Sequence, residues 1–141
     1  MNPDLDAEYM SLALALAEEA AESGEVPIGC VIIDDTGEVI GAGRNRRESA
    51  RNALAHAEIE AIDMACRARG SWRLQGCTAY VTLEPCPMCL GAFRAARISR
   101  VFFGADNINP NAAGQEPVLQ GGVLGQRCRD ILSRFFKSRR Q

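Results

Sequence analysis

Several features that define other classes of protein are missing from this sequence. There is no Lys or Arg before Arg44, so the N-terminus lacks the basic region of a secretory signal peptide. The apolar run YMSLALALA is too short to cross a bilayer. We therefore expect a cytoplasmic protein with no membrane segment, whose six cysteines stay out of disulfides in a reducing environment. Histidine is also nearly absent, because His56 is the single one in 141 residues.

The composition is typical of one ordinary domain spanning 1–141. With 47% hydrophobic residues, the chain has enough apolar side chains to build a core. Its charge is uneven, because residues 44–141 carry sixteen Lys and Arg but eight Asp and Glu, a net of +8. This asymmetry is compatible with an anionic partner such as nucleic acid. The alternative is a solvated surface balanced by an acidic first helix, and charge alone favours that alternative.

Apolar periodicity and turn residues predict both helices and strands. Helices are expected at 4–23, about 55–69, 86–98 and from about 124 to the end, and strands at 28–33, 38–43, 77–83 and 100–105. DDTG predicts a hairpin turn between the first two strands. The run from 77 to 105 predicts a βαβ unit with parallel strands. LEPCPMC would then lie at the carboxyl end of a strand, where ligands bind in such sheets.

The residues with candidate chemistry lie in AHAE and EPCPMC. Cys86 and Cys89 are three positions apart at an expected helix start, where the helix dipole favours thiolates and both sulfurs share one face. Together with the imidazole of His56 they offer three ligands for Zn²⁺. Three protein ligands and an open position for water are typical of a catalytic zinc site, whereas a structural site has four. Glu58 is then better placed to face that water as a base than to bind the metal.

Each of these fragments has a simpler explanation when it is taken alone. A lone histidine is more often structural, and Cys-x-x-Cys can be a dithiol redox pair. The other four cysteines, Cys30, Cys66, Cys77 and Cys128, are interpreted as small core residues. Together, however, His-x-Glu followed by Pro-Cys-x-x-Cys is the signature of zinc-dependent nucleobase deaminases.

The chain also resembles a known family over almost its whole length. The segments that carry the resemblance, in family order, are GEVPIG (24–29), GRNR (43–46), AHAEI (55–59), YVTLEPCPMCLGA (80–92), RVFFGA (100–105), AAG (112–114) and FFKSRR (135–140). The sequence is similar to the bacterial tRNA-specific adenosine deaminases of the cytidine-deaminase-like superfamily. The resemblance implies a three-layer α/β/α fold with a mixed five-stranded sheet. It also implies a homodimer whose active site lies near the subunit boundary.

The resemblance assigns roles to individual residues. It implies that zinc is held by His56, Cys86 and Cys89 and that Glu58 shuttles protons. It further implies that the target base contacts Asn45, in a pocket lined by segments that contain Ile28 and Leu54. The implied reaction is hydrolytic deamination at C6 of adenine or at the equivalent carbon of another base. An RNA base has to leave its stack to react, so a single-stranded loop such as the tRNA anticodon loop is the favoured substrate.

The chain departs from the family pattern in several loops. Asn52, Ala53 and Leu54 stand where the family usually has Asp-Pro-Thr. One of the family positions that match Asn107, Asn109 and Asn111 usually holds a basic residue, which this chain lacks. The segment after Gly114 is also shortened. These changes leave the zinc chemistry intact and affect the RNA-binding side.

Three functions therefore remain open from the sequence. The first is an enzyme that converts adenosine to inosine at the tRNA wobble position, with Lys137, Arg139 and Arg140 on phosphates. The second is a deaminase of a small free purine, pyrimidine or nucleoside, such as guanine or cytosine, in which case those cations are merely solvated and Phe135 and Phe136 are core residues. The third is a zinc-stabilised binding module without catalysis, which would have no use for an unliganded Glu58.

Overall fold

The computed structural model describes residues 2–106 and 117–139, and five strands among these residues form one mixed sheet. The strands are β1 (Gly29–Ile33), β2 (Val39–Arg44), β3 (Thr78–Leu83), β4 (Arg100–Ala105) and β5 (Val118–Gln120). Their order in the sheet is β2-β1-β3-β4-β5. β1 is antiparallel to both of its neighbours, whereas β3, β4 and β5 run parallel. The mixed five-stranded sheet and the parallel pairing within 77–105 are both confirmed.

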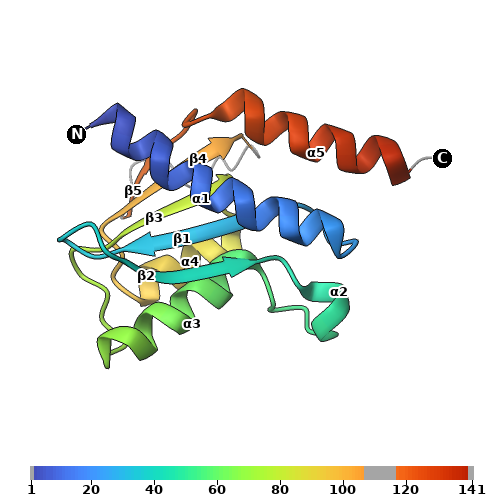
Figure 1. Ribbon diagram of the computed structural model, residues 1–141. Helices are drawn as coiled ribbons and strands as arrows, with labels where there is room; N and C mark the ends of the chain where they lie inside the picture. Colours follow the sequence, from blue (N-terminus) through green and yellow to red (C-terminus); the bar gives the residue numbers. More distant parts are fainter. Residues whose placement is uncertain (1, 107–116, 140–141) are drawn as a thin grey trace.

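Helices cover both faces of this sheet. They are α1 (Pro3–Glu22), α2 (Arg47–Ala50), α3 (Ala57–Arg69), α4 (Pro87–Ala95) and α5 (Gly125–Arg139). Figure 1 shows α1 and α5 on one face and α3 and α4 on the other, with the short α2 at one end of the molecule. The expected three-layer arrangement is therefore confirmed. Among the described residues, no helix is both long and apolar enough to span a bilayer.

The strands supply side chains to a separate core on each face, as the twofold period of a strand requires. In β1, Ile32 packs in the core beneath α3 and α4, while Val31 packs in the core beneath α1 and α5. β3 alternates in the same way, with Val81 in the first core and Tyr80 in the second. All five residues of β1 are buried, because this strand lies inside the sheet with helices above and below it.

Two glycines in β2 let α3 pack directly against the edge of the sheet. A Cβ at Gly41 would lie 2.3 Å from the carbonyl oxygen of Ala61, and one at Gly43 would lie 2.4 Å from that of Ala57. Both distances are shorter than any real contact, so larger residues at these positions would push the helix away. The first turn of α3 is held in this way, and this turn contains Glu58.

The largest differences from the expected elements are at helix ends and in short elements. The helix expected over 86–98 ends at Ala95, because Arg97 has a left-handed backbone with φ of 66° and turns the chain toward β4. The helix expected from about 55 begins at Ala57, because His56 is extended. Neither α2 nor β5 is predicted, since each is too short to show a period. The hairpin turn at 34–37 is confirmed, with Asp34 accepting hydrogen bonds from the N–H groups of Thr36 and Glu38.

Candidate active site

The candidate metal ligands meet where α3 and α4 begin. His56 is the extended residue just before α3, and Cys86 is the extended residue just before α4, while Cys89 lies in the first turn of α4. His56 Nδ1 is 3.8 Å from Cys86 Sγ and 3.4 Å from Cys89 Sγ. All three ligand atoms lie within 4.8 Å of one another. Residues thirty positions apart are therefore brought together at the carboxyl end of β3, as expected.

The donor set and the spacing of these atoms fit a zinc ion. Tetrahedral zinc with ordinary bond lengths places a histidine nitrogen and a cysteine sulfur about 3.5 Å apart. The observed separations of 3.4 and 3.8 Å agree with this value. Burial lowers the pKa of His56, and the positive charge of Arg47 lowers it further, so the imidazole is held in the neutral form that binds metals.

When protein groups alone are considered, burial raises the pKa of Cys89 well above its usual range, and the charges of Glu58 and Cys86 raise it further. The Cys89 side chain is completely buried, and this desolvation opposes the helix dipole, which favours the thiolate. The thiolate form of the two cysteines stays a prediction. A coordinating thiol loses its proton to Zn²⁺ outright, so metal binding here is coupled to proton release.

Glu58 faces the same centre from the first turn of α3. Its side chain is only 4% exposed, and the Cys89 thiol donates a hydrogen bond to its carboxylate. Burial raises the pKa of Glu58 to about 7, although its own backbone N–H and Cys89 partly oppose the shift. His56 is extended and lies outside the helix. His56 and Glu58, although only two positions apart, can therefore both approach one point beyond the start of α3. A buried carboxyl with a pKa near neutrality is suited to moving protons in both directions.

The residues expected to contact the substrate have different environments. Asn45 is buried, its Nδ2 donates to the Val26 carbonyl at 3.2 Å, and its Oδ1 accepts from the Arg47 N–H at 3.2 Å. Ile28 is half-buried against the core beneath α3 and α4. Leu54 is 56% exposed in the loop before His56. A backbone hydrogen bond from Arg46 N–H to the Ala55 carbonyl, 2.9 Å long, ties the residue after Asn45 to the residue before His56.

Sequence reasoning missed Glu25, which is 2% exposed. Its carboxylate accepts hydrogen bonds from the N–H groups of Glu48, at 3.1 Å, and Ser49, at 2.7 Å. Burial raises the pKa of Glu25, but the Ser49 and Glu48 donors and the charge of Arg47 outweigh burial, so the pKa lies below its usual value. The GEVPIG motif is the one signal at this position, and a glutamate in such a loop would ordinarily be interpreted as solvated.

The basic C-terminus has a structural contact that the sequence did not indicate. The Arg139 guanidinium donates a 2.6 Å hydrogen bond to the Gly24 carbonyl and stacks 4.8 Å from the ring of Phe135. Lys137 is exposed, and Arg140 lies outside the described residues. The interpretation of both phenylalanines as core residues is wrong, since Phe135 is half-buried and Phe136 is 43% exposed.

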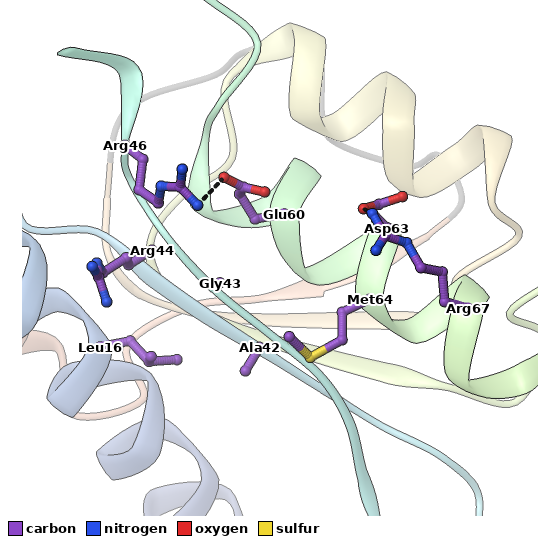
Figure 2. A pocket seen from close by; sticks show the side chains of 9 residues that line it. All are labelled: Leu16, Ala42, Gly43, Arg44, Arg46, Glu60, Asp63, Met64 and Arg67. Atoms are coloured by element: carbon purple, nitrogen blue, oxygen red, sulfur yellow. Dashed lines mark hydrogen bonds and ion pairs between the residues drawn. The ribbon is translucent and has the colours of Figure 1, made fainter. Parts of the chain in front are cut away.

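A separate pocket of about 420 Å³ lies between the edge strand β2, α3 and α1 (Figure 2). Its lining is Leu16, Ala42, Gly43, Arg44, Arg46, Glu60, Asp63, Met64 and Arg67. Figure 2 shows the Arg46 guanidinium turned toward the Glu60 carboxylate, 3.5 Å away. Arg67 pairs with Asp63 in the same way. Arg44, the third arginine of the lining, pairs instead with Glu19, which lies outside it. The pocket is distinct from the centre around His56.

Comparison with known proteins identifies the family. Residues 3–105 match the family model for the cytidine and deoxycytidylate deaminase zinc-binding region. The chain belongs to this family of zinc-dependent deaminases. The deaminase reading of the His-x-Glu and Pro-Cys-x-x-Cys motifs is thereby confirmed, the cofactor is zinc, and the non-catalytic binding module is wrong.

Relatives of this deaminase include proteins that act on tRNA and on a free base. It is 42% identical to the tRNA-specific adenosine deaminase of Bacillus subtilis (strain 168), over 94% of this chain and 89% of the relative. A solved structure from a study of A-to-I editing by tRNA:A34 deaminases at the wobble position is 39% identical, covers 89% of this chain and 99% of its own, and superposes with a TM-score of 0.83. The structure of guanine deaminase from Bacillus subtilis is 38% identical over 81% of this chain and 71% of its own, with a TM-score of 0.68.

The geometry of the centre predicts which cysteines determine zinc content. Wild-type protein should hold one zinc per chain, because two sulfurs and one nitrogen lie at zinc-ligand spacing. His56→Ala, Cys86→Ala and Cys89→Ala should each lose the metal at equilibrium with a chelator, as measured by elemental analysis. Cys66→Ala is the matched control, since this half-buried cysteine lies at the other end of α3, and it should keep the metal. Full zinc retention by Cys86→Ala would contradict the ligand set.

Proposed function

We propose that this deaminase converts adenosine to inosine at the wobble position of tRNA. The observation that carries the proposal is the 42% identity to a tRNA-specific adenosine deaminase over 94% of the chain. The close superposition on a structure from a study of wobble-position deaminases, with a TM-score of 0.83, supports it further. In this proposal residues 1–141 act as a single deaminase domain in the cytoplasm, where tRNA is processed.

In the proposed mechanism His56, Cys86 and Cys89 would hold the zinc, which would supply an activated water and a fixed positive charge at the reacting carbon. Glu58 would accept a proton from the attacking water, deliver it to the ring nitrogen beside the reacting carbon, and then help to protonate the amine that leaves as ammonia. Its buried carboxyl lies beside Cys89 and therefore beside the ligand set. A zinc ion held there would favour the carboxylate form of Glu58, which is the base that the first proton transfer needs.

Asn45, Ile28 and Leu54 form the proposed binding site for the base. The Asn45 amide keeps one N–H and one oxygen lone pair beyond the two bonds that fix its plane, so it can both donate to and accept from a base edge. Ile28 offers an apolar wall. Leu54 stands exposed at the rim, where a flipped nucleotide and its neighbours would pass.

The proposed RNA contacts lie at the C-terminal end of α5. Figure 1 shows this end on the same side of the molecule as α2, and the Arg139 contact with Gly24 agrees with that placement. We assign phosphate contact to Lys137 and Arg140, and to the Arg139 guanidinium through the N–H groups that do not bind Gly24. Arg47, close enough to His56 to affect its pKa, adds a positive charge at the site. An anionic substrate is favoured by this arrangement.

A free-base deaminase is the second candidate. The 38% identity to guanine deaminase favours it, as does the shortened segment after Gly114, which is described from Pro117 onward. The guanine deaminase match covers less of both chains than the wobble-deaminase match, and its TM-score is lower, 0.68 against 0.83. We therefore place tRNA first.

We further propose that the protein is a homodimer whose interface borders the zinc centre. Met88, which lies between Cys86 and Cys89 in the sequence, is 37% exposed, and an interface there would cover it. Sedimentation equilibrium should give the mass of two chains for the wild type. Met88→Asp should be a monomer, whereas Leu12→Asp, which changes a residue on α1 that is 47% exposed, should remain a dimer. A wild-type protein that is monomeric at tens of micromolar would refute the dimer.

Glu58 should be needed for turnover but not for metal binding. Glu58→Gln keeps the size of the side chain and removes the carboxylate, so zinc content and melting temperature should be retained. Activity should fall by about 10² to 10⁴-fold, the usual contribution of general acid–base catalysis. Glu60→Gln is the control, because this glutamate is on the same helix but pairs with Arg46. Near wild-type turnover by Glu58→Gln would reject the mechanism.

The substrate can be decided by salt dependence and by turnover of free bases. Each phosphate contact on single-stranded RNA contributes about −0.7 to the slope of log affinity against log salt. Lys137→Ala should therefore flatten the slope for tRNA by about that amount and raise the KM for tRNA. Arg73→Ala removes the same charge beyond the far end of α3 and should leave the slope unchanged.

Free adenosine, guanine and cytosine are assayed beside tRNA with the same proteins. Arg139 is left intact in this experiment, because its bond to Gly24 gives it a second role in the fold. Fast turnover of guanine, with tRNA neither bound nor edited at low salt, would replace the first proposal by the second.

A further inference from the structure

A buried carboxylate joins the loop between α1 and β1 to α2. Within the described part of the chain, the N-cap residue of α2, Arg46, makes no side-chain capping bond. Glu25 supplies that cap from more than twenty residues away, through bonds of 3.1 Å to the Glu48 N–H and 2.7 Å to the Ser49 N–H. Its own N–H is bound to the Ala20 carbonyl at 2.9 Å, which fixes the glutamate to the end of α1.

The same two segments hold the amide of Asn45 from opposite sides. From the loop, the Val26 carbonyl accepts from Asn45 Nδ2, and the Ile28 carbonyl accepts from the Asn45 backbone N–H at 3.0 Å. From the start of α2, the Arg47 N–H donates to Asn45 Oδ1 at 3.2 Å. Val26 directly follows Glu25, and Arg47 directly precedes Glu48. Glu25 therefore fastens together the two pieces of backbone that set the plane of this amide.

We propose that Glu25 is a positioning residue, which holds Asn45 in the orientation needed to bind the base. The proposal rests on the role of Asn45 given above and extends it to a group that does not touch the substrate. An amide that is free to rotate exchanges its donor and acceptor directions, and would bind a base edge less often in the productive arrangement. Fixing the amide in advance removes that cost from binding.

A neutral glutamine at position 25 cannot accept both of these hydrogen bonds. Its one oxygen can accept from either Glu48 or Ser49, while its NH₂ group faces the other N–H donor. One partly buried bond to a backbone N–H is then lost, so the start of α2 is held less firmly against the loop. The Arg47 N–H moves with α2, so Asn45 Oδ1 loses its fixed partner. The metal ligands lie at the starts of α3 and α4, outside the two segments that Glu25 joins.

The test compares Glu25→Gln with a control that loses an equivalent cap elsewhere. Asn2 caps α1 with bonds of 3.0 and 3.4 Å to two backbone N–H groups, and it lies at the other end of that helix from Glu25. Glu25→Gln should lower kcat/KM about tenfold, mainly by raising KM. This is the size of effect expected when one hydrogen bond to a charged group is lost. Zinc content should not change. Asn2→Ala should lose similar stability without a change in KM, because it does not reach the site.

A double-mutant cycle shows whether Glu25 acts through Asn45. In an Asn45→Ala background, Glu25→Gln should change KM by less than about twofold, since the group that it positions is already gone. The proposal would be overturned if the effects of Glu25→Gln and Asn45→Ala on KM simply multiplied in the double mutant. It would also be overturned if Asn45→Ala kept the wild-type KM. A Glu25→Gln protein that behaves like Asn2→Ala would overturn it as well.

Two further measurements separate the Glu25 proposal from the folding of Asn45→Ala and from the choice of substrate. NMR of the Asn45 side-chain amide in Glu25→Gln should show a shifted resonance, which does not depend on whether Asn45→Ala folds; an unchanged resonance would refute the coupling. The wild type is first assayed on tRNA and on free guanine, and the cycle is run with whichever is turned over. Turnover of guanine alone ends the tRNA proposal but leaves the Glu25 test intact, because both substrates present a base to Asn45.

Discussion

The close packing of α3 against β2 determines where the chemistry can take place. At Gly41 and Gly43 the helix backbone lies so near the strand that a single added carbon would collide with it. This contact fixes the height and the direction of the first turn of α3, and with it the point from which Glu58 projects. The parallel strand β3 delivers the start of α4 to the same end of the sheet. Two helix starts are thus held side by side by sheet geometry, before any metal contributes.

Burial then gives the site its electrostatic character. Glu58 and Cys89 are both inside the protein, in contact with each other, and both have pKa values raised by desolvation. These groups therefore favour their neutral forms when only other protein groups surround them. A divalent cation would stabilise their charged forms instead. The same desolvation that opposes ionisation also makes the charge of the metal more effective at short range.

Sequence patterns predicted those parts of the molecule that depend on local signals. The Asp34 turn, the βαβ unit and the pairing of His56 with Cys86 and Cys89 all follow from turn residues, periodicity and motif spacing. The end of α4 could not be predicted, because Arg97 takes a left-handed backbone that arginine rarely adopts. The capping role of Glu25 and the contact of Arg139 with Gly24 depend on residues far apart in the chain, so no local pattern reveals them. The burial that raises the pKa of Cys89 is a tertiary property, so no local pattern shows it.

The bond between Arg139 and Gly24 links the last helix to the loop that borders the proposed binding site. The start of α1 and the end of α5 therefore differ as attachment points for a fused protein or an affinity tag. The N-terminal end of α1 is about 30 Å away from that loop, the length of a twenty-residue helix. The C-terminal end of α5 lies against the loop itself, so a bulky fusion there would strain the loop through a single guanidinium. The N-terminus is the side on which a fusion leaves the proposed site undisturbed.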